Sequence, residues 1–349
     1  MDRPGDILVP VDFGAPSLRA CDRAIELARE LSAGLTLLHA VDPQSYALLP
    51  DTLEHLRVLA EQTMRITADK LRPHVSQLDT RVEIGPPWRV VAETIEREPP
   101  QLVVCGTHNR RGLSHFALGS VAEHIVRMSP VPVLTVPGHA FETRKAAGER
   151  LFAALASQAV PTPTVVIAIG TDALPVAGAV AQRMNATLGL WGIAFVGAGC
   201  HVFGAVGEDD LIYYDEPWSE VKDRMALESG ARAALRQQMR LLRGTGRLCD
   251  VDGSNVLLVA DALQGGASVR SASRALRSLG ATNIVLAVPV AAESVLERLG
   301  HDVDGVVCIE RTVVSNPLEI AFRRAAGPSE RAIRKLLEGS PGDALRPTP

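Results

Sequence analysis

The sequence is poor in several features that would each indicate a particular class of protein. Aromatic residues make up only 4% of the 349 residues, and the formal net charge is −4. Such a charge gives no overall attraction to nucleic acid or anionic lipid. No apolar run approaches the roughly 20 residues of a membrane-spanning helix. The N-terminus, MDRPGDILVPVD, lacks the basic end and apolar stretch of a signal peptide. We therefore expect neither nucleic-acid nor membrane partners.

Cysteine is also scarce. The five cysteines stand singly at Cys21, Cys105, Cys200, Cys249 and Cys308. Their count is odd, no CxxC pair occurs, and most lie in apolar runs, so they do not form a disulfide framework. We expect buried, reduced thiols in a cytoplasmic protein.

What the sequence does contain is an alternation of strand and helix patterns. The expected strands lie at 6–12, 35–41, 80–85, 101–106 and 132–137. Between them, helical patterns run from a Ser17 cap to Gly34 and over 52–71, 88–98 and 121–128. Ala, Val and Leu must fill the interior, as in helix-covered parallel sheets. This pattern predicts a doubly wound parallel α/β domain.

A second alternation follows a connecting helix over 142–158 and a proline-rich joint over 159–164. Its expected strands lie at 165–170, 187–195, 255–261, 283–290 and 305–310, with a hairpin over 202–215. Helices are expected at 174–184, 216–242 and 268–280. We therefore predict two doubly wound domains at 1–140 and 164–325, a connecting segment at 141–163 and a C-terminal tail at 326–349.

The loop GTHNRRGLSHFALGS, Gly106 to Ser120, has the composition of a phosphate site. It follows a strand, so it lies at the sheet edge where ligands of open α/β sheets bind. Gly119 and Ser120 then begin a helix, whose free N–H groups and dipole favour an anion. The alternative from local physics alone is a tight strand–helix joint, with Ser120 as an ordinary cap.

The segments VPVDFG, LLHAVDP and GTHNRRGLSHFALGSVAEHIVRMSPVPVLTVP resemble, in this order, the universal stress protein family. The resemblance covers about residues 5–137. Nucleotide-binding members of that family carry G-x2-G-x9-G-S/T, and Gly106, Gly119 and Ser120 keep this pattern. Asn109 replaces the second glycine. Asn tolerates a positive φ, but its side chain fills space that phosphate oxygens would cross.

The resemblance implies an adenine-nucleotide site for ATP, with Mg²⁺ as a candidate companion. Pro10 and Asp12 would line the adenine and ribose end, and Ala40 and Val41 would offer backbone groups to adenine. The phosphates would be surrounded by Gly106, Asn109, Arg110, Gly119, Ser120 and Val121. The alternatives are an Asx turn at Asp12 and core packing at Ala40 and Val41. The resemblance also implies a homodimer through 132–137.

No metal site and no catalytic residue are expected in this domain. His108 and His115 stand in the loop without a third ligand, so we read them as surface residues. The domain also offers no nucleophile paired with a base.

Residues 255–291 form a strand, an acid at its tip, a loop of small residues and a helix, which again predicts an anion site. Asp261 would accept hydrogen bonds from ribose hydroxyls. A 5′-phosphate would face the amides of Gly265, Gly266, Ala267 and Ser268. The stretch resembles the signature of type I phosphoribosyltransferases that binds phosphoribosyl pyrophosphate (PRPP), and the resemblance extends over about 164–312.

This second resemblance has specific departures. Ala260 replaces one of two adjacent acids, and Ala267 replaces the first hydroxyl of the loop. Asp172 brings negative charge to the loop that would meet pyrophosphate, and Ala194 and Phe195 stand in place of a basic pair. Because the leaving pyrophosphate needs Mg²⁺ and positive charge, these losses argue against turnover.

We therefore predict an ATP-binding stress-response module fused to an inactive phosphoribosyltransferase-like domain. The alternatives are an active PRPP-dependent transferase and a structural dimer without a ligand.

Overall fold

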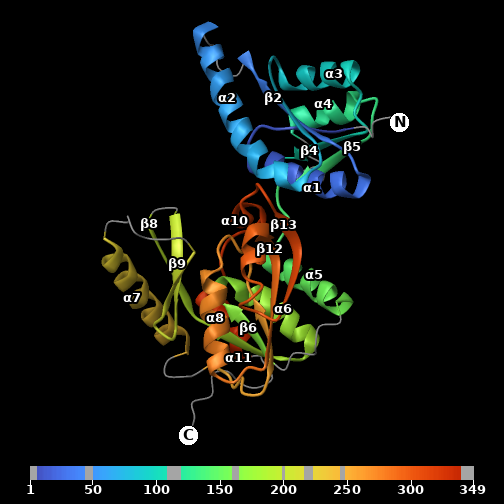
Figure 1. Ribbon diagram of the computed structural model, residues 1–349. Helices are drawn as coiled ribbons and strands as arrows, with labels where there is room; N and C mark the ends of the chain where they lie inside the picture. The colour runs from blue at the N-terminus through green and yellow to red at the C-terminus, as the bar shows by residue number, and fades with distance from the viewer. Residues whose placement is uncertain are drawn as a thin grey trace. The chain divides into compact units, whose positions relative to one another are not determined.

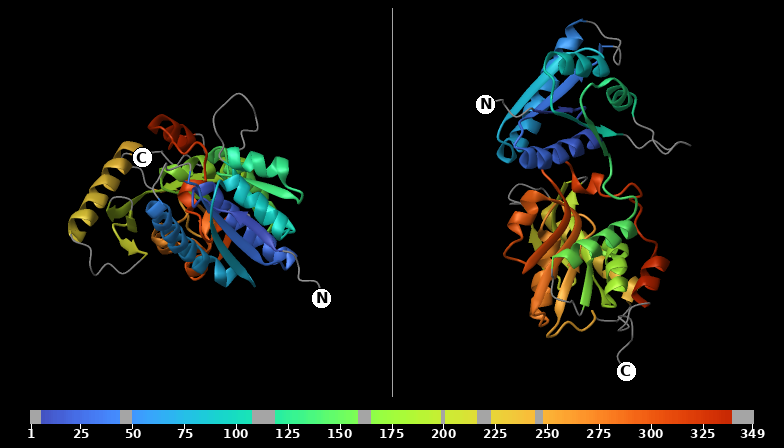
Figure 2. Two further views of the ribbon diagram at one scale, coloured as in Figure 1. Left: turned by 90° about the horizontal axis from the view of Figure 1, so that it is seen from above. Right: turned by 90° about the vertical axis from the view of Figure 1, so that its right-hand side faces the viewer.

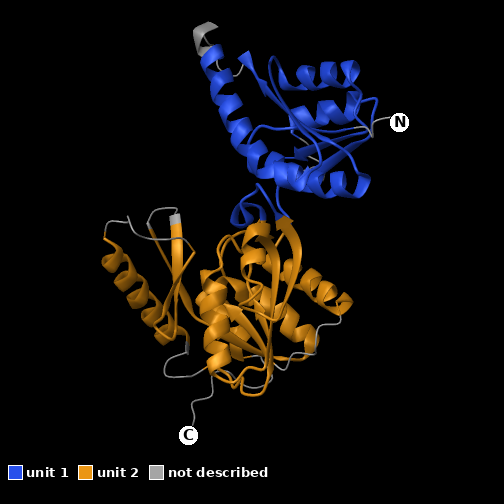
Figure 3. Cartoon of the chain, viewed as in Figure 1, with its two compact units in different colours: residues 1–140, 312–320 blue, residues 141–311, 321–349 orange. Residues whose placement is uncertain are grey.

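Two five-stranded sheets organise the chain, each in its own unit (Figure 1). The computed structural model describes residues 6–43, 50–107, 119–158, 165–198, 201–215, 223–243 and 248–338. Unit 1 comprises residues 1–140 and 312–320, and unit 2 comprises residues 141–311 and 321–349 (Figure 3). The predicted fold class, two α/β domains around parallel sheets, is confirmed. The domain bounds read from the sequence remain a prediction.

Unit 1 alternates strands and helices along its first 140 residues. The strands are β1 (Ile7–Pro10), β2 (Leu35–Val41), β3 (Leu78–Ile84), β4 (Leu102–Thr107) and β5 (Val133–Pro137). The helices are α1 (Ala15–Leu31), α2 (Pro50–Leu71), α3 (Pro87–Arg97) and α4 (Ser120–Met128), and α10 (Pro317–Ile320) lies in the later segment. The strands are parallel in the order β3-β2-β1-β4-β5. The order therefore reverses between β1 and β4, which makes a switch point of the kind where ligands bind.

Both faces of this sheet are covered by helices (Figures 1 and 2). Successive residues of β1 point to opposite faces, as the pleat of a strand requires. Ile7 and Val9 pack with residues of α1 and α2. Leu8 packs instead with Val91 of α3 and Ile125 of α4. The apolar runs predicted as strands are thus buried on both faces of a parallel sheet.

The ends of α1 differ from the sequence prediction. The helix begins at Ala15 after Gly14, not after a Ser17 cap. Asp12 accepts a hydrogen bond from the Gly14 N–H at 2.9 Å, and the Ser17 hydroxyl donates to the same oxygen at 2.6 Å. At the other end Ser32, rather than Gly34, takes the left-handed φ of 54°. The turn after β1 is thus closed by a carboxylate that the helical pattern does not reveal.

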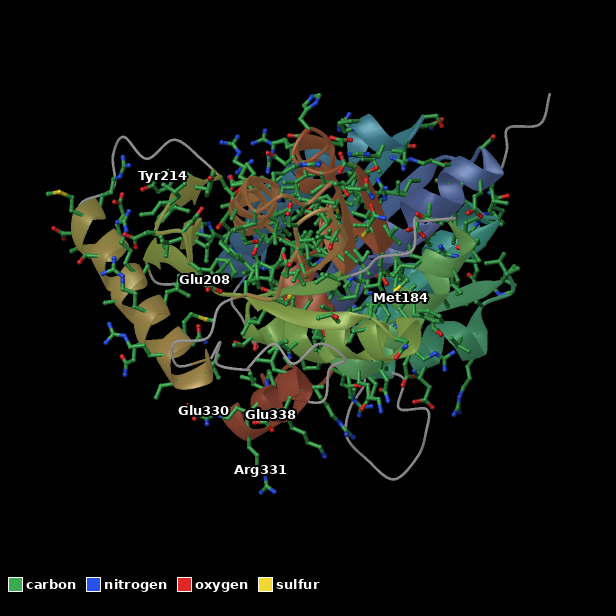
Figure 4. The ribbon with its side chains drawn as sticks, turned by 90° about the horizontal axis from the view of Figure 1, so that it is seen from below. Met184, Glu208, Tyr214, Glu330, Arg331 and Glu338 are labelled. Atoms are coloured by element: carbon green, nitrogen blue, oxygen red, sulfur yellow. The ribbon has the colours of Figure 1, made fainter. Side chains whose placement is uncertain are left out.

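Unit 2 has a second parallel sheet. Its strands are β6 (Val165–Ile169), β7 (Thr187–Trp191), β11 (Asn255–Val259), β12 (Asn283–Ala292) and β13 (Gly305–Thr312), in the order β13-β12-β11-β6-β7. Its helices are α5 (Arg144–Ser157), α6 (Leu174–Met184), α8 (Ala267–Ser278), α9 (Glu293–Arg298) and α11 (Glu330–Glu338). α8 contributes Val269, Ala272 and Leu276 to the main core. α5 and α6 pack on each other, and Arg331 of α11 points away from the unit (Figure 4).

A small antiparallel sheet of β8 (Ile193–Ala198), β9 (His201–Gly207) and β10 (Ile212–Tyr214) also belongs to unit 2. The predicted hairpin over 202–215 is confirmed, but the single strand predicted over 187–195 is wrong. It breaks at Gly192, whose N–H donates to the carboxylate of Glu208. The small sheet lies beside α7 (Arg224–Arg243) (Figure 4). Tyr214 of β10 donates its hydroxyl hydrogen to Glu228 of α7.

No helix in the described ranges is both long and apolar enough to cross a bilayer.

The segment 312–320 completes unit 1 through a buried carboxylate of α1. Asp22 accepts hydrogen bonds on Oδ1 from the N–H groups of Val313 at 2.8 Å and Val314 at 3.0 Å. Its Oδ2 accepts the N–H of Ser315 at 3.2 Å. Burial raises the pKa of Asp22, and hydrogen bonds from this segment oppose the rise. One side chain thus satisfies three consecutive backbone donors that lie about 290 residues further along the chain.

Replacing Asp22 tests this anchor. Asp22→Ala leaves three backbone donors without their acceptor, so we expect a loss of about 3 kcal/mol in the free energy of unfolding. Asp22→Asn keeps one carbonyl oxygen and should lose less. Urea denaturation of the full chain measures both. The exposed Asp69→Ala variant is the control, and an equal loss in it and in Asp22→Ala would contradict the assignment.

Candidate functional site

A cavity of about 390 Å³ opens in unit 1 at the carboxyl ends of β1, β2 and β4. It occupies the switch point of the sheet, and its volume is within the range of small-molecule sites. Of the residues predicted for the nucleotide site, those that line it are Pro10, Asp12, Ala40, Gly106, Gly119, Ser120 and Val121. Val41 does not line it; its side chain is buried in the core. Asn109, Arg110, His108 and His115 lie outside the described residues.

Much of the cavity wall is apolar. Ala40 of β2 lines one side of it. Pro87 and Val91 of α3 and Ile125 of α4 face the same space. Cys105 also lines it, and burial raises the pKa of this thiol to about 11. A thiol with such a pKa is almost entirely protonated at neutral pH and is a poor nucleophile. The wall therefore suits an uncharged group, and this thiol is not activated for covalent chemistry.

Gly106 is a glycine for a reason that does not involve a ligand. A Cβ at this position would collide with the carbonyl group of Pro16 and would stand 2.7 Å from the backbone nitrogen of Ser17. The end of β4 and the first turn of α1 can approach this closely only because residue 106 has no side chain. The glycine pattern in the sequence thus reports packing of the cavity floor as well as space for a ligand.

The turn after β1 shapes the rim of the cavity. Asp12 makes the Asx turn that the sequence left as an alternative, with Gly14 as its donor. Phe13 adopts a φ of 62°, which is rare for a bulky residue, and its ring lies 4.7 Å from that of His39. His39 Nδ1 lies 2.7 Å from the Val11 carbonyl oxygen. Since a carbonyl only accepts, Nδ1 carries a proton.

His39 lines the cavity but was not among the predicted residues. Because His39 stands in an apolar strand pattern, nothing but its residue type could have indicated that it lines the cavity.

The start of α4 faces the cavity with its backbone. Gly119 is the N-cap, with φ −59° and ψ 155°, and no side chain of the described residues caps the helix there. Ser120 is the first helical residue rather than the cap, and it lines the cavity with Val121 and Ala122. The first N–H groups of a helix have no intrahelical acceptor and carry the positive end of the dipole. This part of the wall can therefore receive an anion.

The loop before α8 in unit 2, predicted as a second phosphate site, is engaged by the protein itself. Gly266 N–H and Ala267 N–H donate to Asp215 Oδ1 at 2.7 and 2.9 Å, and Arg270 Nη2 donates to the same oxygen at 2.8 Å. Gly265 lies against the other carboxylate oxygen. Ser268 is buried. Asp215 lies 50 residues before this loop, so nothing local to the loop could have indicated it.

Asp261, the predicted ribose ligand, forms an ion pair. Arg144 donates to Asp261 Oδ2 from Nη2 at 3.0 Å and from Nε at 3.1 Å, and the Ala262 N–H donates to Oδ1 at 2.9 Å. Burial raises the pKa of Asp261, while Arg144 opposes the rise and Asp172 adds to it. Asp172 lies in the short turn 171–173 after β6, and Phe195 of β8 is exposed.

No group of three His, Cys, Asp or Glu side chains suited to a metal ion occurs among the described residues.

Comparisons with known proteins find two families in succession along the chain. The universal stress protein family matches residues 5–137, and the phosphoribosyl transferase domain family matches residues 140–321. The second match includes α5, where the sequence pattern predicts a connecting segment.

Individual proteins resemble one part of the chain or the other. A universal stress protein of Methanocaldococcus jannaschii is 28% identical over 136 residues, which are 37% of this chain and 80% of that protein. A crystal structure from Thermus thermophilus is 26% identical and covers 56% of this chain and 97% of its own, with a TM-score of 0.45. A universal stress protein in complex with cAMP is also 26% identical, covering 39% of this chain and 99% of its own, with a TM-score of 0.31.

Both resemblances seen in the sequence are confirmed. The match over 140–321 spans just over half of the chain, so this protein belongs to the phosphoribosyl transferase domain family and carries a universal stress protein domain ahead of it.

Proposed function

We propose that unit 1 binds an adenine nucleotide, ATP, in the cavity at its switch point and acts as a regulatory module of the stress response. The observation that carries this proposal is the combination of an apolar wall with the open start of α4 in one cavity. The apolar side would hold the adenine ring, and the helix start would hold phosphate. A cytoplasmic location is part of the same proposal, and it rests on the odd count of five cysteines and the lack of any CxxC pair in the sequence.

The residues have distinct parts in this proposal. Ala40 and His39 would meet the base. Val41 is less suited, because its carbonyl already accepts the Gly85 N–H at 3.0 Å. Pro10 and Asp12 would border the sugar. Gly119, Ser120 and Val121 would give N–H groups to the phosphates, and Mg²⁺ would accompany ATP on the phosphate oxygens.

Two further phosphate contacts are proposed from the family pattern alone. Asn109 and Arg110 would border the same phosphates, and both lie outside the described residues.

Titration calorimetry with ATP, AMP and adenosine tests the nucleotide site in the full chain. Ala40→Trp fills the apolar side and should weaken all three ligands by at least about tenfold. Ser120→Asp places a negative charge at the phosphates and should weaken ATP while sparing adenosine. It is compatible with the fold because an acid in the first helical turn is stabilising. The exposed Ala226→Trp variant in α7 is the control. Undetectable ATP binding in the wild type, or unchanged binding in both cavity variants, would refute the proposal.

We also propose that unit 2 does not transfer phosphoribosyl groups. Asp261 is neutralised by Arg144, and Asp172 adds negative charge close to it. A leaving pyrophosphate needs positive charge and a metal ion, and the departures at Ala194 and Phe195 remove basic groups that related sequences carry.

An active PRPP-dependent transferase is the rival function, and a coupled assay distinguishes the two. With PRPP, Mg²⁺ and a panel of nucleobases, we expect the wild type to release pyrophosphate no faster than Asp261→Asn. That variant keeps the size of the side chain and removes its charge. Release clearly above this background would establish the rival.

We propose, finally, that unit 1 pairs with a second copy through β5. β5 is the last strand of this sheet in the part of the chain that the structure describes, so its outer side offers N–H and C=O groups that no described strand pairs with. The N–H of Val103 on β4 bonds to the carbonyl of Pro132 at 3.0 Å. In a parallel ladder, this places the N–H groups of Val133 and Thr135 on the outer side. Val126 and Met128 of α4, which packs near β5, are exposed apolar side chains.

Thr135→Pro is therefore designed to break the dimer without breaking the fold. Proline removes an N–H that β4 does not use, and edge strands accept it at such positions. We expect the wild type to sediment as a dimer and Thr135→Pro as a monomer in analytical ultracentrifugation. Thr135→Ala keeps the N–H and should remain dimeric. A monomeric wild type, or a dimeric proline variant, would contradict pairing through β5.

A further inference from the structure

The joint between β11 and α8 in unit 2 has the geometry of an anion site, and the anion is a side chain of the same unit. Three donors converge on Asp215 Oδ1: the N–H groups of Gly266 and Ala267, and the guanidinium of Arg270. All three distances lie between 2.7 and 2.9 Å. This is how helix starts bind phosphate oxygens.

Asp215 is held in place from both sides of its own strand. It directly follows β10, and its N–H donates to the Phe203 carbonyl of β9 at 2.8 Å. Arg270 also donates to the Tyr214 carbonyl at 3.0 Å, and the Arg274 guanidinium lies 5.3 Å from the centre of the Tyr213 ring. The side chains of Asp215 and Arg270 are 15% and 19% exposed. The end of β10 is thus fastened to α8 by a largely buried ion pair.

The loop is shaped around this carboxylate. A Cβ at Gly265 would collide with Asp215 Oδ2, so the absence of a side chain there fits the bound carboxylate. An arriving phosphate would need the same N–H groups and the same guanidinium. Since two anions cannot share these donors without strong repulsion, one must leave before the other binds.

We propose that Asp215 is a built-in occupant that closes this loop to phosphate monoesters. The inference does not depend on the nucleotide site of unit 1. It deepens the proposal that unit 2 is not a transferase, and it rests on the loop before α8 being an anion site. Wild-type unit 2 excludes phosphate, and release of the end of β10 from α8 uncovers the site.

Titration calorimetry of the full chain with inorganic phosphate tests this directly and needs no turnover. Asp215→Ala removes the occupant and should bind phosphate at least about tenfold more tightly than the wild type. Asp215→Asn keeps an oxygen for the two N–H groups but loses the charge, so its gain should be smaller. Asp215→Ala combined with Arg270→Ala should lose the gain. Phosphate that binds elsewhere contributes equally to all four proteins.

The outcomes separate cleanly. Equal phosphate binding by the wild type and Asp215→Ala would overturn the proposal, and so would a gain that persists without Arg270. If Asp215→Ala does not fold, Asp215→Asn carries the same comparison, and an unchanged affinity in it would overturn the proposal. Pyrophosphate release in the transferase assay would refute the lack of transfer, whereas phosphate titration reports only whether the loop is closed.

Discussion

Backbone N–H groups that lack acceptors at the starts of helices and turns are the constraint on which both units depend. The chain meets it with carboxylates: Asp12 for the turn into α1, Asp22 for residues 313–315, and Asp215 for α8. Each supplies the oxygen acceptors that such groups need. The start of α4 receives no side-chain cap from the described residues, and it faces a cavity. The two candidate sites thus differ at their helix starts. The start of α8 has a carboxylate as acceptor, whereas the start of α4 has no side-chain acceptor among the described residues.

The two units share this architecture but differ in the partners of the polar groups at their strand ends and helix starts. Both place a strand end beside a helix start at one edge of a parallel sheet. In unit 2, the polar groups that would meet a sugar phosphate are paired among themselves. Arg144 binds Asp261, donates to the carbonyl groups of Ala325 and Ala326, and lies over the Phe322 ring at 4.8 Å. A guanidinium with so many partners is part of the packing, and in our proposal it keeps Asp261 from meeting a ligand.

Local patterns predicted much of this structure. Strand β2 matches its apolar run, and the cavity is lined by most of the residues predicted for it, from the strand ends and from the start of α4. What could not be predicted depends on partners far apart in the chain. Asp215 and Gly266 are 51 positions apart, and Asp22 and Val313 are 291 apart. Neither contact can be recognised from the hydrophobic periodicity of the sequence. The break at Gly192 is similar, because the acceptor for its N–H is Glu208, in the turn after β9.

Unit 1 is discontinuous in sequence, and this has a consequence for synthesis on the ribosome. Its sheet is complete by residue 140, but the residues that bind Asp22 are translated only after about 170 more. At elongation rates of about 5 to 20 residues per second this delay is about 10 to 30 s. During that interval a carboxylate destined for burial stays hydrated in the nascent polypeptide. The domain that emerges first is thus completed only after most of its neighbour has been translated.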